Sequence, residues 1–219
     1  MNCGNCEHFN ACARFWFSDY DSTKTIEETK EKHKNDSACE LYRHVVLNEY
    51  GVMTSIQPLW CEPITQRLKT AEVRKNKPKI KLPFRGFIYC TQPKGKYDFG
   101  LCIDEGRIGL ISKSNYPIAE NYDITILSGK VIGEYVCNEI EYLGNIATDP
   151  WTSLVGDTHE RLKKLVVDKA CLTEEQLHAY GGKYLWHLSD VVIYSEPKTL
   201  KDFGLFDAPQ SWCYVQTQK

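Results

Sequence analysis

The stretch QRLKTAEVRKNKPK, residues 66–79, joins a short alternating segment to a dense run of positive charge. Within it, the apolar residues Ala71 and Val73 alternate with the charged residues Glu72 and Arg74. A period of two is typical of a strand, so we expect the apolar pair in the core and the charged pair on the opposite face. The stretch therefore predicts a strand of the sheet and the side chains of that strand that can meet a ligand.

Lys69 precedes this strand and follows a helix predicted for residues 58–68, which Pro63 should kink or shorten. Lys69, Glu72 and Arg74 then converge where a helix end meets a sheet. Arginine can fork onto a phosphate or a base edge, lysine supplies a point charge, and glutamate accepts from an exocyclic amine. The alternative is a surface ion pair between Glu72 and Arg74, which would contribute little to stability.

Positive charge is concentrated around this strand although the whole chain carries a net charge of −2. Eight basic residues stand against Glu72 alone between positions 67 and 85, a local charge of +7. An anionic ligand feels such a local patch, because charges beyond about 8 Å are screened at physiological salt. A solvated lysine-rich loop is the alternative. The basic residues are Arg67, Lys69, Arg74, Lys75, Lys77, Lys79, Lys81 and Arg85.

The overall composition is that of a globular protein: 42% of the 219 residues are hydrophobic and 26% are charged. We find no apolar run near the ~20 residues that a membrane helix needs, and the polar beginning MNCGNCEHFN has no features of a secretory signal. We therefore expect a cytoplasmic protein with reduced thiols that does not enter a membrane.

Several short alternating segments and only two or three helices predict a mixed α+β fold, with a curled sheet or small β-barrel and flanking helices. This domain should span residues 49–219, after a separate module at residues 1–48. A helix is predicted over residues 158–180, with a break before a new N-cap at Thr173. Strands are predicted at residues 52–56, 70–76, 85–92, 107–112, 123–128, 130–143, 184–194 and 211–216.

The N-terminal module carries a candidate metal site. Cys3 and Cys6 have the C-x2-C spacing that lets two thiolates bind one ion from a tight turn, and Cys12 and Cys39 complete a tetrahedral set. Zinc is the expected ion, in a structural role. In place of Cys12, the fourth ligand could be His8, His33 or His44.

Four segments together resemble one known family: SIQPLWCEPITQRLKTAEVRK, FIYCTQ, GKVIGEYVCNEIE and YLWHLSDVVIY. They are similar to the ASCH domain family of the PUA-like superfamily, particularly to bacterial and phage versions with PQSWCYV at the C-terminus. The resemblance covers about residues 50–219. It implies a PUA-like barrel with a cleft for RNA or a modified nucleobase. The signature positions of the family fall on Lys69, Glu72, Arg74 and Glu134.

Some members of that family are hydrolases, either ribonucleases or amidohydrolases of acylated cytidine derivatives. Glu72 stands where those amidohydrolases have a threonine nucleophile, so their mechanism does not transfer directly. A hydrolase of this type would instead use Lys69, Glu72 and Glu134. From the residues alone, Glu134 lies among aliphatic neighbours and needs a cation, for which we predict Lys69.

Aromatic residues provide candidate stacking surfaces for bases, at Trp186 and Trp212. The favoured function is binding of RNA, a nucleotide or a modified nucleoside. A third possibility is a protein-interaction adaptor acting through the N-terminal module. The predicted ligand-binding set is Lys69, Glu72, Arg74, Lys75, Lys77, Trp186, His187 and Trp212.

Overall fold

The computed structural model describes residues 49–96, 98–143, 164 and 166–217. The predicted zinc ligands, the module at residues 1–48 and its boundary with the following domain lie outside the described residues. The first part of the helix predicted over residues 158–180 also lies outside them.

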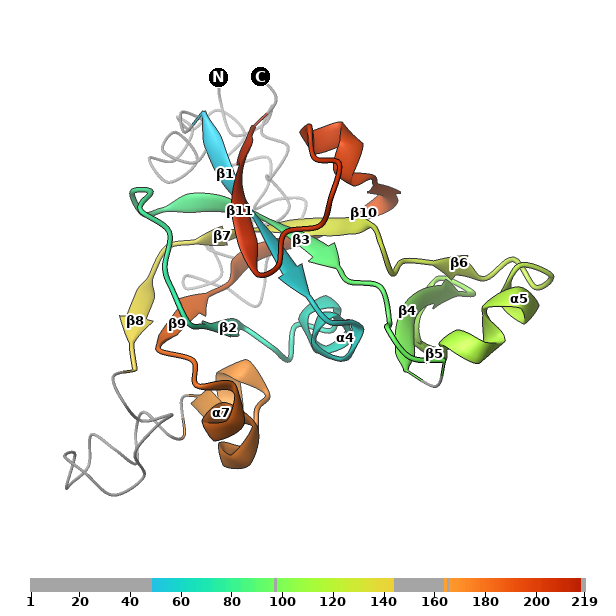
Figure 1. The fold of residues 1–219 in the computed structure, drawn as a ribbon, viewed down its shortest axis with the longest axis horizontal. Helices are drawn as coiled ribbons and strands as arrows, with labels where there is room; N and C mark the ends of the chain where they lie inside the picture. Colours follow the sequence, from blue (N-terminus) through green and yellow to red (C-terminus); the bar gives the residue numbers. More distant parts are fainter. Residues whose placement is uncertain (1–48, 97, 144–163, 165, 218–219) are drawn as a thin grey trace, which may run out of the picture.

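The described strands form three open sheets (Figure 1). The largest has the order β10-β7-β3-β1-β11 and is mixed, because β1 pairs in parallel with β3 while its other pairs are antiparallel. Two three-stranded sheets have the orders β2-β9-β8 and β5-β4-β6. The strands are β1 (Tyr50–Ile56), β2 (Ala71–Arg74), β3 (Phe84–Cys90), β4 (Phe99–Asp104), β5 (Arg107–Ser112), β6 (Thr125–Ile126), β7 (Val131–Cys137), β8 (Ile140–Tyr142), β9 (Tyr184–His187), β10 (Ser189–Lys198) and β11 (Trp212–Gln216).

Short helices connect and cover these sheets. Helix α4 (Pro58–Thr65) ends three residues before the predicted limit, shortly after its internal Pro63. Helix α7 (Glu174–Tyr180) begins with the predicted cap, since Thr173 and Gln176 form a reciprocal capping box. Gly181 closes α7 with a φ of 64°, a conformation that glycine adopts without strain. The remaining short elements are α5 (Tyr116–Ala119), η3 (Lys113–Asn115) and η4 (Leu200–Phe203).

The predicted α+β class is confirmed, but two predicted long strands are each divided between two sheets. Residues 130–143 form β7 in the five-stranded sheet and β8 in a three-stranded sheet. Residues 184–194 belong to β9 and β10, which lie in those same two sheets. Asp190 has a φ of 47°, and the β7–β10 register shifts between Ser189 and Val192. Such an irregularity bends a strand, which lets the chain turn from one sheet into the other.

Three hydrophobic clusters hold these layers together. The largest joins α4 to the five-stranded sheet and to Trp186 of β9. A second packs β2 and β9 against the segment 166–170 and α7. The third lies on the other face of the five-stranded sheet, where η4 packs against its strands. Strand β2 therefore lies between two apolar clusters, and all four of its residues are buried.

None of the described helices combines the length and hydropathy that a bilayer span requires.

Candidate ligand-binding site

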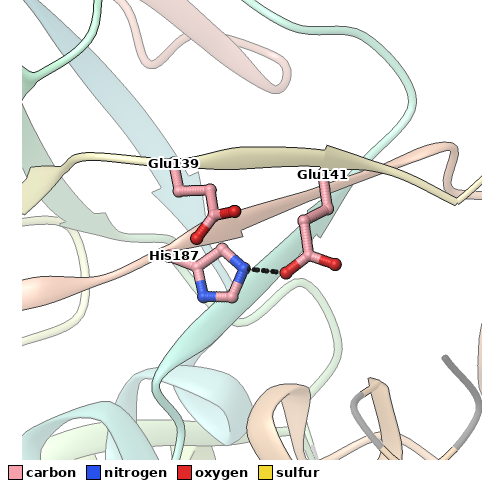
Figure 2. Close-up of side chains that lie close together, drawn as sticks. All are labelled: Glu139, Glu141 and His187. Atoms are coloured by element: carbon pink, nitrogen blue, oxygen red, sulfur yellow. Dashed lines mark hydrogen bonds and ion pairs between the residues drawn. The ribbon is translucent and has the colours of Figure 1, made fainter. Parts of the chain in front are cut away.

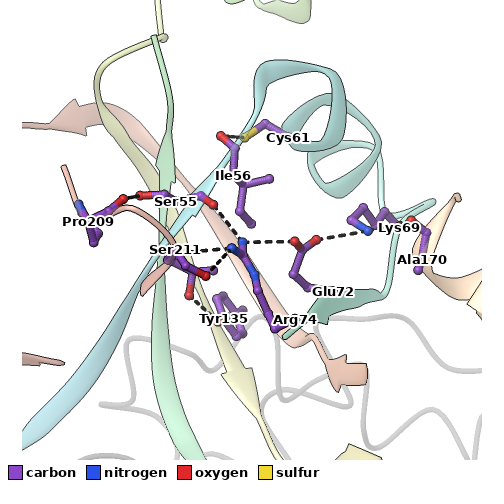
Figure 3. Close-up of polar contacts among 11 residues, drawn as sticks. Ser55, Ile56, Cys61, Lys69, Glu72, Arg74, Tyr135, Ala170, Pro209 and Ser211 are labelled. Carbon is purple, nitrogen blue, oxygen red and sulfur yellow. Dashed lines mark hydrogen bonds and ion pairs between the residues drawn. The ribbon is translucent and has the colours of Figure 1, made fainter. Parts of the chain in front are cut away.

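Lys69 lies in the turn between α4 and β2, and its side chain points inward (Figure 3). Only 2% of the residue is exposed. Its Nζ donates to the carbonyl oxygen of Ala170 at 2.6 Å and lies 3.1 Å from Oε2 of Glu72. The Nζ also lies 5.6 Å from the ring centre of Trp60, within the range of a cation–π contact. Lys69 is therefore a fixed buried cation and not a mobile surface lysine.

Glu72 is shared between two cations (Figure 3). Its Oε2 faces Lys69, while its Oε1 lies 3.0 Å from Nη2 of Arg74. The same Nη2 donates to the carbonyl oxygen of Ser55 at 2.8 Å, and Nη1 contacts both oxygens of Ser211 at 3.2–3.3 Å. Arg74 thus connects β2 to β1 and to the residue before β11. We call Lys69, Glu72 and Arg74 the buried charge network.

The buried charge network has unused donor capacity. One carboxylate meets two cations, so the network carries a charge of +1 when all three groups are ionised. Among the described residues, Nε of Arg74 and Nε1 of Trp186 are buried without an acceptor. Glu72 and Trp186 are paired in the β2–β9 register, so both side chains project from the same face. Since buried donors are normally paired, each of these N–H groups would be stabilised by an acceptor from a ligand or a water.

The surroundings of this network are apolar. Burial is the main cause that raises the pKa of the Cys61 thiol well above its usual value, and the neighbouring Cys90 raises it further. Burial also raises the pKa of the Tyr135 hydroxyl, although this group shares a 2.8 Å hydrogen bond with Thr54. Neutral thiol and phenol groups leave the ionic contacts in a medium of low polarity, where charges interact more strongly than in water.

The basic side chains of residues 67–85 are divided between the interior and the surface. Lys69 and Arg74 are buried against Glu72, and Arg85 pairs with Glu134. The lysines at positions 75, 77, 79 and 81 are exposed. The structure therefore separates a lysine surface from the charges that the sequence grouped with it.

Aromatic side chains accompany the exposed lysines. Lys75 Nζ lies 5.4 Å from the ring centre of Tyr180, and Lys77 Nζ lies 5.8 Å from that of Tyr184. The Tyr184 ring is 5.3 Å from that of Tyr142, which is 62% exposed. Lysines and accessible rings on one surface can bind phosphates and bases together.

The predicted pairing of Lys69 with Glu134 is wrong. Glu134 is buried in β7, where its Oε2 accepts from Arg85 at 2.5 and 3.1 Å and from the Tyr194 hydroxyl at 2.7 Å. A register shift between Ile88 and Tyr89 of β3 marks an irregularity opposite β7. Arg85, facing Glu134 from the neighbouring strand, is the cation that sequence reasoning missed. Lys69 and Glu134 thus belong to separate networks and do not form a pair.

The three aromatic and histidine candidates have different positions. Trp186 is fully buried, with its ring 5.9 Å from that of Phe84 and 6.0 Å from that of Trp212. Trp212 is partly exposed and leads to Tyr214, 43% exposed, at 5.5 Å. His187 pairs in register with Ala71, so alternation places its side chain on the face opposite Glu72. Trp212 is thus the more accessible of the two predicted stacking residues.

Comparison with known proteins returns structural neighbours but no sequence match. No protein-family model matches the chain, and no curated protein is significantly similar to it. The crystal structure of ASCH from Zymomonas mobilis is similar with 19% identity and a TM-score of 0.48, over 76% of this chain and 87% of that one. A serine-to-alanine mutant of the same protein gives 19% identity and a TM-score of 0.49, over 77% and 90%. An identity of 19% with TM-scores below 0.5 gives no basis for assigning the roles of residues in that protein to residues of this chain.

Proposed function

We propose that the protein binds RNA or a nucleotide as an ASCH-like module, with the exposed lysines attracting phosphate and the buried charge network holding one end of the ligand. The observation that carries this proposal is the pair of buried donors without acceptors, Arg74 Nε and Trp186 Nε1, on the strand pair that contains Glu72. A phosphate or base oxygen accepts from such donors, and the net positive charge of the network favours an anionic group.

The lysine surface supplies the part of binding that does not depend on sequence. Lysines at phosphates release counterions, so affinity falls as salt rises. The rings of Tyr142 and Tyr184, with Trp212 and Tyr214, offer stacking surfaces, each contact worth about 1–3 kcal/mol per base. Bases splayed from a single strand can reach such rings, whereas bases in a duplex cannot. Single-stranded RNA is accordingly the first ligand to test.

Alanine at Lys75 or Lys77 should weaken binding to all RNA sequences by a similar factor. Because each lysine supplies one phosphate contact, each change should reduce the slope of log affinity against log salt by about 1. The measurement is a titration of labelled single-stranded RNA pools at several salt concentrations. Lys201→Ala, at an exposed position of η4 outside residues 67–85, serves as the matched control. An unchanged slope in both lysine variants would contradict the proposed phosphate contacts.

A structural zinc ion in the N-terminal module, bound by Cys3, Cys6, Cys12 and Cys39, is part of the same proposal. Its support is the C-x2-C spacing at the start of the sequence. Metal analysis of the purified chain should give one zinc per protein, and the zinc should be lost when Cys3 and Cys6 are both changed to serine. Equal zinc content in the two proteins would contradict this ligand set. Deleting residues 1–45 and comparing the proteins that co-purify tests the adaptor alternative.

A further inference from the structure

A second site lies on the β2-β9-β8 sheet, on the face opposite to the buried charge network. Glu139, Glu141 and His187 gather there, and their side chains point toward one another (Figure 2). Their candidate donor atoms, one from each residue, all lie within 4.8 Å of one another. We propose that these three side chains bind a divalent transition-metal ion, with Mn²⁺ and Zn²⁺ as the fitting ions.

The backbone fixes the relative positions of these side chains. Residues Ile140 and Trp186 are paired in the β8–β9 register, and the His187 N–H donates to the Glu139 carbonyl at 3.0 Å. Glu139 and Glu141 are two residues apart, so both project from the same face as His187. Side chains held on paired strands are better fixed than side chains on a loop, which favours a site that exists before the ion arrives.

The charges at this place favour a cation. The contact between His187 Nε2 and Glu141 Oε1, at 2.6 Å, is the only side-chain hydrogen bond or salt bridge that these three residues make within the part of the chain that the structure describes. Neither carboxylate meets a lysine or an arginine there, in contrast to Glu72 and Glu134, which each have a basic partner. Two neighbouring carboxylates repel each other, and an ion of charge +2 would remove this repulsion.

The donor set and its dimensions fit this class of ion. Metal–nitrogen and metal–oxygen bonds of about 2.0–2.2 Å allow donor atoms up to about 4.4 Å apart, so the side chains need only a small rotation to close around an ion. One imidazole with two carboxylates suits Mn²⁺ and Zn²⁺, whereas Mg²⁺ and Ca²⁺ prefer an all-oxygen set. Glu139 is exposed and the other two side chains are partly buried, which leaves room for water to complete the coordination.

Mn²⁺ is the appropriate probe because the cysteines of this chain bind it weakly, while zinc already held by thiolates can remain in place. The free ion gives an electron paramagnetic resonance signal that falls on binding, and a titration of the full-length protein then yields the stoichiometry and Kd. We expect a single Mn²⁺ per chain. Glu139→Gln and Glu141→Gln should each weaken binding by at least about 10-fold. Glu196→Gln, at an exposed glutamate of β10, should leave the Kd unchanged.

A second measurement observes the proposed histidine ligand directly in the wild-type protein. In the wild-type protein, Mn²⁺ should broaden the ring resonances of His187, which are assigned by their absence from the spectrum of His187→Gln. Broadening of a different histidine, or equal uptake of Mn²⁺ by the wild type and the two glutamate variants, would overturn the proposed site. Thermal unfolding of each variant without metal shows whether a lost site reflects a lost fold.

Discussion

Replacing Glu72 with alanine is expected to lower the free energy of unfolding by about 3–5 kcal/mol, one of the two largest effects we predict. The substitution leaves Lys69 and Arg74 as buried cations without their shared carboxylate. Their remaining partners are carbonyl and hydroxyl oxygens, which cannot balance two positive charges. Urea unfolding of the wild type and the variant measures the difference.

Two further proteins make this prediction specific. Glu120→Ala, at an exposed position after α5, should change the free energy by no more than about 0.5 kcal/mol. Adding Lys69→Met to Glu72→Ala should recover part of the loss, because one of the two stranded cations is removed. A loss below about 1 kcal/mol for Glu72→Ala, with no recovery in the double variant, would show that the network is hydrated and contributes little.

Replacing Trp186 with alanine is expected to cost about 3–5 kcal/mol of stability, the second of the largest effects. The ring is fully buried between Phe84 and Trp212, and its removal would leave a cavity in the largest hydrophobic cluster. Trp212→Ala should cost less stability because that ring is partly exposed, and it should weaken RNA binding more clearly. Urea unfolding and RNA titration of the same two variants provide the comparison.

The opposite pattern would assign different roles to the two tryptophans. If Trp186→Ala remained as stable as the wild type but lost RNA binding, Trp186 would be the stacking residue despite its burial. Trp186→Phe is the conservative control, since it retains an aromatic ring and removes the indole N–H that lacks an acceptor. A stable Trp186→Phe protein with weakened nucleotide binding would support a role for that donor in binding.

Alternation along the chain was sufficient to predict β2 and the shared face of Glu72 and Arg74. It also predicted the interior positions of Ala71 and Val73, and local capping chemistry predicted the start of α7 at Thr173. These features depend on neighbours within a few residues, which a sequence displays directly. For the same reason the mixed α+β class followed from the number and length of the alternating segments.

Contacts between distant segments could not be predicted in this way. The Arg85 partner of Glu134 comes from strand pairing 49 residues apart, and the Ala170 carbonyl that accepts from Lys69 has no sequence signal. The division of residues 130–143 between two sheets was missed because strand-like alternation continues on both sides of the bend. Glu139 and Glu141 had a detectable signal, two glutamates spaced to share a strand face, but their pairing with His187 required the register of β8 and β9.

The arrangement also separates the candidate catalytic residues. A hydrolase with Lys69 and Glu134 as an acid–base pair would need both at one reacting group. In the structure each is held by other partners, Lys69 by Glu72 and Ala170, and Glu134 by Arg85 and Tyr194. This separation favours binding without turnover as the proposed function.

The most direct test of the proposed function is incubation of the full-length protein with a labelled single-stranded RNA pool at several salt concentrations, with retained and cleaved RNA measured together. Lys69→Met is the informative variant, because Glu72 keeps its contact with Arg74 when the second cation is removed. Lys201→Met is its control. We expect retention that weakens with salt, falls in Lys69→Met but not in Lys201→Met, and occurs without cleavage. Absence of salt-dependent retention, or cleavage that depends on Lys69, would contradict a module that only binds RNA.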